Sequence, residues 1–428
     1  MDFGSILHYL KLLPVFVLMI SILVAAHEFG HYLFARLFGM GVEEFAIGFG
    51  RKPIWTWMRK TYSVESTSGP AGAGAQEYNY ATDGSSALAP EPAPTPSATK
   101  LTVTETTDFT IRPWPLGGFV RIKGMMPEED GSETQIPGGF YSKAPWKRFF
   151  VLLAGPVFSV LAGVAILFFV FLVYGKPTMG QTPEFEDVMQ NGPAWNAGLR
   201  AGDRIVSLDG KNVAKAYDVV VGIRDNAGKH LPITFMHDGN LQTSTLTPVL
   251  EATPSTVVGP DMKGTDEKRP QGKLGAIWKT TYERVGFGEA VEMAVEAPVN
   301  VITSLVELFK KPADLKDSVG GPGAIVKATS DAVRLGLDRV FILSASLSIS
   351  VGIFNLFPVP PLDGGQMLVA VAEMLRGGRR LSLRVQSAVA AIGFALVAML
   401  IVSVLWLDTS RLVKGDDRFK EMVSGQKK

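Results

Sequence analysis

Long apolar segments alternate with polar regions along the chain. Four of these segments approach the length of about 20 residues that a helix needs to cross a lipid bilayer. They lie within residues 1–38, 149–174, 340–364 and 386–407. The first is interrupted near its C-terminal end by a polar cluster, whereas the second contains no charged residue. The pattern therefore predicts a polytopic α-helical membrane protein with four transmembrane helices.

Basic residues gather in three of the connecting regions, and their positions predict the orientation of the chain. They follow the first apolar segment, precede the second, and separate the third from the fourth: Arg51, Lys52, Arg59, Lys60, Lys143, Lys147, Arg148, Arg376, Arg379, Arg380 and Arg384. Because basic residues concentrate in cytoplasmic loops, we expect these regions in the cytoplasm. The long segment between the second and third spans then lies outside. Residues 408–428 form a tail of mixed charge that adds little to this orientation.

Residues 39–148 contain two stretches rich in aromatic and β-branched residues, "RKPIWTWMRKTYSV" and "DFTIRPWPLGGFVRIKG". Their partial alternation of apolar and polar positions predicts two strands, so we expect a membrane-associated β-hairpin or sheet. Between them, from about residue 65 to residue 106, the composition falls to Ala, Gly, Pro, Ser and Thr, which is typical of a disordered insertion. The tryptophans of the two stretches suit a sheet at the membrane interface.

Residues 178–250 have the pattern of a small α+β domain outside the membrane. The stretch "AGLRAGDRIVSLDG" combines glycine turns with a strand that ends in an Asp-Gly turn, and it resembles a PDZ domain of the bacterial, protease-associated type. Only one such copy is apparent. Residues 251–281 are polar and rich in Pro and Gly, so we expect a linker there. Residues 282–335 show helical spacing with acidic residues on one face, which predicts amphipathic helices on the outer membrane surface.

The composition narrows the chemistry that the chain can perform. It has 428 residues, a net charge of +1 and no cysteine. The balanced charge gives no reason to expect a nucleic-acid partner. The absence of cysteine excludes disulfides and thiolate metal sites. There are only five histidines, and two of them lie in the polar cluster of the first span.

That polar cluster reads "HEFGH", from His27 through Glu28 to His31. Residues four positions apart lie on one face of a helix, so the two histidines can hold one zinc ion while the glutamate acts as a base. Ionisable side chains inside a bilayer are costly unless they are paired or ligated, which indicates a functional cluster. The alternative is a cluster that only satisfies its own hydrogen bonds between helices.

A catalytic zinc site normally takes three protein ligands and keeps one position open. The other three histidines are poorly placed, since one starts the first span and two lie in the region outside the membrane. We therefore expect a carboxylate from another span. The third span ends in "NLFPVPPLDGG", where prolines prevent a regular helix and Asp363 supplies the acid. Asn355 adds an amide donor before it, although the same motif could also be an ordinary loop exit.

Together these motifs and the PDZ-like stretch resemble the site-2 protease family, most closely the bacterial regulator-of-sigma-E proteases, over nearly the whole chain. The resemblance implies an intramembrane metalloprotease in which His27, His31 and Asp363 bind Zn²⁺ and Glu28 and Asn355 take part in catalysis. It also implies a bacterial inner membrane protein whose zinc site lies toward the cytoplasm and whose PDZ-like domain is periplasmic. The residues implied to bind substrate, as a strand added to the hairpin or near the reacting carbonyl, are Pro115, Leu116, Gly117, Gly118, Phe119 and Asn355.

The implied function is regulated intramembrane proteolysis of single-pass membrane proteins, such as anti-sigma factors and signal-peptide remnants, after trimming by another protease. Membrane lipid is the other implied partner. The best-known bacterial members carry two PDZ domains, so a single one leaves open whether it recruits substrates or filters them by size. Two other classes remain: a catalytically silent scaffold that presents the PDZ-like domain, and a zinc transporter. A transporter would be expected to carry more polar residues in the second and fourth spans and an internal repeat.

Overall fold

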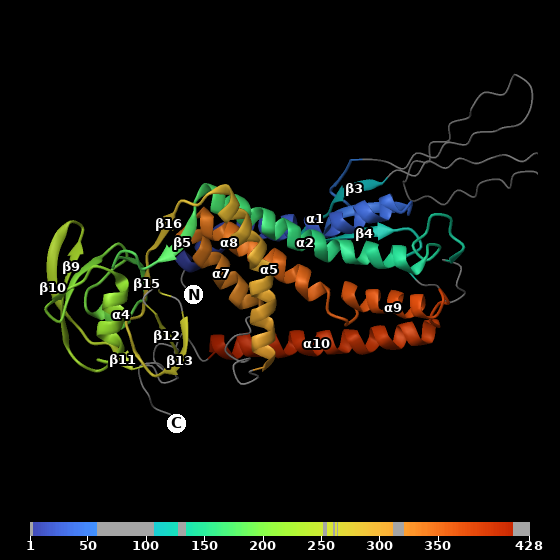
Figure 1. The fold of residues 1–428 in the computed structure, drawn as a ribbon. Coiled ribbons are helices and arrows are strands. Elements are labelled where there is room, and N and C mark those ends of the chain that lie inside the picture. Colours follow the sequence, from blue (N-terminus) through green and yellow to red (C-terminus); the bar gives the residue numbers. More distant parts are fainter. Residues whose placement is uncertain are drawn as a thin grey trace, which may run out of the picture. The chain divides into compact units, whose positions relative to one another are not determined.

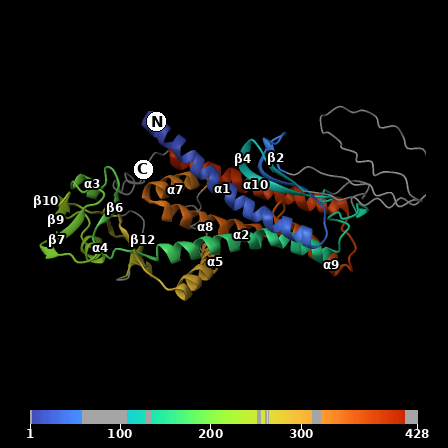
Figure 2. The same cartoon turned by 90° about the horizontal axis from the view of Figure 1, so that it is seen from above.

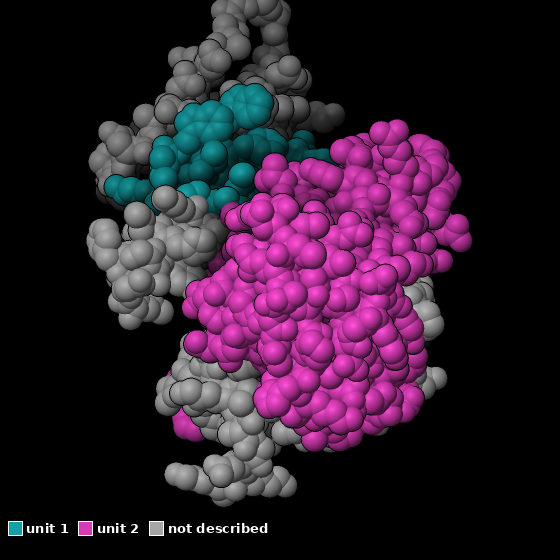
Figure 3. All heavy atoms as spheres, turned by 90° about the vertical axis from the view of Figure 1, so that its left-hand side faces the viewer, with its two compact units in different colours: residues 1–164, 344–399 teal, residues 165–343, 400–428 magenta. Residues whose placement is uncertain are grey.

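The computed structural model describes residues 3–57, 107–126, 134–250, 255–310 apart from 260, 261 and 263, and 321–413 (Figure 1). The chain divides into two compact units (Figure 3). Unit 1 comprises residues 1–164 and 344–399, and unit 2 comprises residues 165–343 and 400–428. The predicted insertion at 65–106 lies outside the described residues.

Within the described part of the chain, four helices are long and apolar enough to cross a membrane, as the hydrophobic pattern predicts. They are α1 (Phe3–Leu37), α2 (Pro145–Val173), α8 (Leu337–Asn355) and α10 (Leu383–Val413). The predicted third span, 340–364, is too long at its C-terminal end. Three prolines between residues 358 and 361 cannot continue the helix, so α8 ends at Asn355. A short helix that we did not predict, α9 (Asp363–Leu375), begins after this break.

Unit 1 contains a four-stranded sheet rather than the simple hairpin expected for residues 39–148. Its strands are β1 (Val42–Phe49), β2 (Trp55–Thr56), β3 (Asp108–Ile111) and β4 (Trp114–Ile122), in the order β2-β3-β1-β4. β2 and β3 pair antiparallel on either side of the insertion, as the hairpin prediction requires. β1 was missed, and it lies between β3, to which it is parallel, and β4, to which it is antiparallel.

β1 was missed because its glutamates interrupt the apolar alternation. Glu44 is nevertheless buried in the sheet, where its carboxylate accepts hydrogen bonds from Arg112 (2.5 Å) and Thr110 (2.6 Å). A buried carboxylate that is paired in this way no longer opposes a strand in the interior. Helix α1 packs against β1 and β4, and it runs beside part of α2 (Figure 2).

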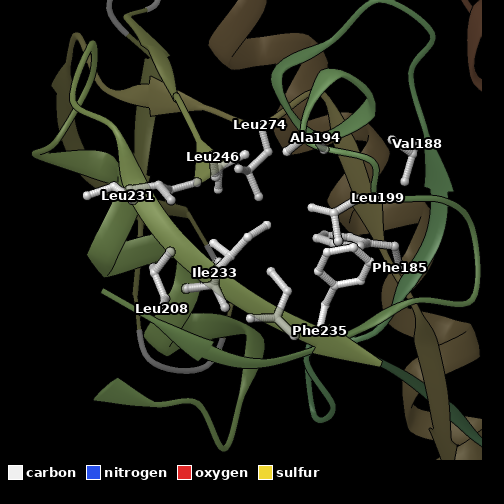
Figure 4. Packing of buried hydrophobic residues seen from close by; sticks show 14 residues of the cluster. Phe185, Val188, Ala194, Leu199, Leu208, Leu231, Ile233, Phe235, Leu246 and Leu274 are labelled. Carbon is white, nitrogen blue, oxygen red and sulfur yellow. The ribbon is translucent and has the colours of Figure 1, made fainter. Parts of the chain in front are cut away.

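Unit 2 contains the PDZ-like domain. Its elements are β5 (Lys176–Met179), β6 (Phe185–Val188), α3 (Pro193–Asn196), β7 (Arg204–Leu208), β8 (Lys211–Asn212), α4 (Ala216–Arg224), β9 (Leu231–His237) and β10 (Asn240–Leu246). One sheet has the order β10-β9-β7-β8. Apolar side chains from this sheet, from α3 and from the loops point toward one another in a common core (Figure 4).

The prediction of a linker at residues 251–281 is wrong. This region contains β12 (Ser255–Val258), β13 (Gly264–Arg269), β14 (Gly272–Lys273), β15 (Ala276–Trp278) and the first half of β16 (Thr280–Glu283), and β14 pairs with β11 (Val249–Leu250). β15 pairs with β6, β16 pairs with β5, and Leu274 belongs to the domain core. These strands are too short to show an alternating pattern, and β15 and β16 find their partners far away in the sequence. The PDZ-like domain therefore extends from residue 176 to residue 283.

Two helices occupy most of the predicted amphipathic region 282–335, namely α5 (Phe287–Lys310) and α7 (Pro322–Leu335). Ala290 and Ala294 of α5 are fully buried. A neighbouring side of α5 exposes a stripe of larger apolar residues at helical spacing: Phe287, Val291, Val295, Val299, Ile302 and Val306. Helix α5 is thus amphipathic, and its position on a membrane surface stays a prediction.

Candidate metal centre

Three side chains from two helices of unit 1 converge on one point. His27 and His31 lie one turn apart on α1, and Asp363 is the first residue of α9. The Nε2 atom of His27 lies 3.1 Å from Asp363 Oδ2, the Nε2 atom of His31 lies 3.4 Å from the same oxygen, and the two nitrogens are 3.3 Å apart. Both histidines are buried. Among the described residues, this is the group of His, Asp and Glu whose ligand atoms could hold a metal ion.

Helix α2 holds the other side of both imidazoles. The Nδ1 atom of His31 donates a hydrogen bond to the carbonyl oxygen of Val151 (2.8 Å), and Nδ1 of His27 lies 2.8 Å from the hydroxyl of Ser159. Gly155 lies between them, and a Cβ atom there would overlap the His31 ring. Residues 151, 155 and 159 share one face of α2, so a single helix face orients both rings.

These hydrogen bonds leave the two Nε2 atoms free to act as ligands. A carbonyl can only accept, so His31 carries a proton on Nδ1, and in the neutral imidazole its Nε2 presents a lone pair. That lone pair faces a carboxylate oxygen and a second imidazole nitrogen, an arrangement that favours a cation among them. Zinc–ligand bonds of about 2.0–2.1 Å place two tetrahedral ligands about 3.3–3.4 Å apart. The observed separations of 3.1, 3.3 and 3.4 Å therefore fit a tetrahedral zinc ion.

Glu28 lies beside this group and beside the sheet. Its carboxylate interacts with the backbone amide of Val120 in β4 and electrostatically with both histidines and Asp363. Nearer the start of β4, the hydroxyl of Ser21 donates a hydrogen bond to the carbonyl oxygen of Pro115 (3.1 Å). Among the described strands, β4 pairs only with β1, so it is an edge strand of the sheet. The edge strand and the glutamate of the HExxH motif thus lie next to each other.

A cavity of about 660 Å³ adjoins β4 and the start of α9. It lies wholly within unit 1, and most of its walls are apolar. Residues that line it include Phe119, Met125, Tyr141, Leu152, Pro361 and Val369. Pro360, Pro361 and Gly365 of its wall flank Asp363 closely in sequence, so the cavity reaches the neighbourhood of the three-residue group.

Comparison with known proteins identifies the family. The model of the family described as Peptidase family M50 matches residues 15–79 and 95–400. The chain belongs to peptidase family M50. This membership bears out the resemblance to site-2 proteases and the expectation of an enzyme of the metalloprotease type.

Relatives of this M50 peptidase align over nearly its full length. A protein of Brucella suis biovar 1, whose name describes a zinc metalloprotease, is 31% identical over 92% of this chain and 93% of its own. The zinc metalloprotease RasP of Bacillus licheniformis is 28% identical over 93% of this chain and 98% of its own. The protease Eep of Enterococcus faecalis is 27% identical over 94% of this chain and 99% of its own. Among solved structures, the PDZ domain of the SdrC-like protein of Listeria monocytogenes aligns with 21% of this chain and 87% of its own, at 15% identity and a TM-score of 0.15.

The structure brings some of the predicted site residues of the M50 peptidase together and leaves others apart. His27, Glu28, His31 and Asp363 form one cluster. Asn355 is the last residue of α8, and no described contact joins it to this cluster. The predicted substrate-binding residues Pro115, Leu116, Gly117, Gly118 and Phe119 all lie on β4, and the side chain of Leu116 is outside the described part.

No sequence pattern predicted the residues of α2 that contact the two histidines. Val151, Gly155 and Ser159 are small or apolar residues in a long apolar span, and such residues are common in transmembrane helices without any functional role. The only available signal was the stretch "AGPVFS", in which a glycine and a serine lie four positions apart, at the same interval as the two histidines of α1. That spacing becomes meaningful only once α2 is known to pack against α1.

Proposed function

We propose that this chain is a zinc-dependent endopeptidase that cleaves the membrane-spanning segments of single-pass membrane proteins. The observation that carries the proposal is the convergence of His27 Nε2, His31 Nε2 and Asp363 Oδ2 at separations suited to one tetrahedral zinc ion. Membership of peptidase family M50 and the names of the relatives support the reaction class.

The two histidines and Asp363 would hold the zinc ion. When bound, zinc supplies Lewis-acid polarisation of the scissile carbonyl and makes water more acidic. Glu28 accepts a proton from the attacking water and delivers it to the nitrogen of the leaving amine. The hydrogen bonds between His31 and Val151 and between His27 and Ser159 keep both rings oriented with their Nε2 atoms toward Asp363.

The substrate would bind as an additional strand on β4. A peptide bond in a transmembrane helix is protected by its own hydrogen bonds, so the substrate must unwind before cleavage. An edge strand offers unpaired backbone groups that hold an extended peptide, and neighbouring apolar pockets accept its side chains. We assign this role to residues 115–119, and the adjoining cavity receives apolar side chains of the substrate. Asn355 stabilises the reacting carbonyl in this proposal, which requires the end of α8 to approach the substrate.

The distribution of basic residues supports the orientation we propose. The metal centre faces the cytoplasmic side of a bacterial inner membrane, and the PDZ-like domain lies in the periplasm. Anti-sigma factors and signal-peptide remnants, trimmed beforehand by another protease, are the substrates that the family resemblance implies.

The decisive experiment is the Glu28→Gln variant of the purified full-length chain in detergent. We expect it to bind one zinc ion per chain, as the wild type does, and to cleave a single-pass membrane reporter at least 10²-fold more slowly, since a positioned base contributes about 10²–10⁴-fold. Glu289→Gln, on the exposed side of α5, is the matched control and should leave cleavage unchanged. Cleavage by Glu28→Gln at the wild-type rate would overturn the assignment, and zinc transport into vesicles without cleavage would favour a transporter.

The role of the PDZ-like domain needs a deletion that respects its boundaries. Removing only residues 178–250 would leave β15 and β16 without their partners β6 and β5. Removing residues 176–283 takes the whole domain away. A size filter predicts faster cleavage of an untrimmed substrate by this deletion variant, whereas a recruiting domain predicts slower cleavage.

A further inference from the structure

A buried ion pair joins α2 to α9 within unit 1. Arg148, in the first turn of α2, places a guanidinium nitrogen 2.5 Å from Oε2 of Glu373, and their side chains are 6% and 0% exposed. The other carboxylate oxygen of Glu373 accepts a hydrogen bond from the backbone N–H of Leu381 (3.1 Å). The guanidinium of Arg148 also lies 5.1 Å from the centre of the Tyr141 ring. Both oxygens of the carboxylate are therefore engaged.

Such a pair is a poor way to gain stability. Removing two charges from water costs several kcal/mol per ion, and apolar residues of similar volume often serve equally well. A charged pair does restrict geometry, because the short contact between the guanidinium and the carboxylate is kept only over a narrow range of relative positions of the two helices. Apolar contacts tolerate sliding and rotation far better. The role of this ion pair therefore follows from the parts of the molecule that it holds in position.

Both helices of the pair carry parts of the metal centre. On α2, Arg148 lies on the same face as Val151, Gly155 and Ser159, at intervals of three, four and four residues. That face holds the two imidazoles. On α9, Glu373 lies ten residues after Asp363, or about 15 Å at 1.5 Å per residue.

Helix α9 is therefore attached at both of its ends. At its start, Gly364 and Gly365 pack so closely on the backbone of the proline-rich segment that a Cβ atom on either would overlap it. Near its other end, Glu373 is attached to the α2 face that orients the histidines. Two attachments determine the direction of a helix, and the direction of α9 determines where its first side chain lies.

We propose that Arg148 and Glu373 are positioning residues that set Asp363 at ligand distance from His27 and His31. The proposal rests on the proposed function, because it assigns a role to these residues through the zinc site. Neither residue touches the metal or the reacting atoms. The pair acts through α9, and its loss moves the third ligand while the two histidines stay in place.

Four variants of the full-length chain test this role. Glu373→Gln breaks the pair, and Arg148→Met combined with Glu373→Met removes both charges without leaving one buried alone. Arg148→Lys keeps an opposite charge and is the conservative variant. Glu186→Gln is the control, because it breaks an ion pair with Arg339 in unit 2 (3.3 Å, with 18% and 20% exposed side chains).

The readouts are zinc affinity, measured by competition with a chelator, and the visible absorption of the Co²⁺-substituted protein, which reports ligand geometry. We expect Glu373→Gln and the double Met variant to bind zinc about 10–100-fold more weakly, the range for lost outer-sphere partners, with an altered cobalt spectrum. Arg148→Lys should lie within a few-fold of the wild type, and Glu186→Gln should match it. If Glu373→Gln does not fold, the double Met variant decides, since it removes both buried charges of the pair together.

A folded double Met variant with wild-type zinc affinity and an unchanged cobalt spectrum would overturn the positioning role and leave the proposed function intact. Zinc binding by the wild type that His31→Ala does not weaken would instead overturn the proposed function, and this proposal with it. The two failures are therefore distinguishable.

Discussion

Replacement of Gly155 by alanine should weaken zinc binding, although it raises the intrinsic helix propensity of α2. A Cβ atom at this position would overlap the His31 imidazole and would lie only 2.5 Å from its Cε1 atom. Ordinary contacts between carbon atoms need about 3.5 Å or more, so the ring must move by at least about 1 Å. The ring cannot rotate freely away from the new Cβ atom, because its Nδ1 atom is hydrogen-bonded to the carbonyl oxygen of Val151.

The expected cost follows from this displacement. Misplaced or poorly supported ligands lose about 10–100-fold in metal affinity, which corresponds to about 1.4–2.7 kcal/mol. Intrinsic helix propensity works in the opposite direction, since alanine is favoured over glycine in a helix by about 0.8–1.0 kcal/mol. We therefore expect a Gly155→Ala chain that folds, binds zinc more weakly and cleaves a membrane reporter at least tenfold more slowly.

Two control variants separate crowding at the histidine from crowding in general. In Gly163→Ala, on the same helix, the new Cβ would meet Ile349 and the backbone of Ala345 and no histidine. In Gly288→Ala, on α5, it would meet open space. Titration with zinc against a chelator should show a loss only for Gly155→Ala. Equal zinc affinities in Gly155→Ala and the wild type would refute the packing argument for the site.

Three further predictions address other contacts. Ser159→Ala removes the oxygen beside Nδ1 of His27 and should weaken zinc binding about tenfold or more, as seen by the same titration. Glu44→Ala leaves buried arginine charge in the sheet and should destabilise the chain by about 3–5 kcal/mol, as measured by denaturation in detergent. The hydrogen bond to Asp203 (2.7 Å) raises the pKa of His237, so this pair stabilises the PDZ-like domain below the ordinary histidine pKa and loses that effect as pH rises through the raised value. NMR titration should show the raised pKa, and His237→Gln should remove this part of the pH dependence of unfolding.

The sequence was sufficient to predict the four long apolar helices and the convergence of His27, His31 and Asp363, because both rest on strong physical constraints. Ionisable residues in apolar spans are rare, so the HExxH motif and Asp363 could be paired by their similar depth. The prediction of a linker at 251–281 was wrong, since strands of a few residues carry no periodic signal and their partners are set by tertiary contacts. β1 was missed because Glu43 and Glu44 oppose the apolar alternation, and only the folded sheet brings Arg112 beside Glu44. The support of the histidines by α2 depends on helix packing, which no local pattern reports.

The pairing of β5 with β16 has a consequence for how proteins of this kind can diverge. Lys176 lies opposite Glu283, so the PDZ-like domain begins and ends at neighbouring points and connects to the rest of the chain through a two-stranded stem. Domains with adjacent ends can be inserted, duplicated or lost with little strain on their host. A second copy could therefore be added within the same stem while the membrane helices keep their connections. The number of PDZ-like domains can then vary in evolution independently of the metal centre.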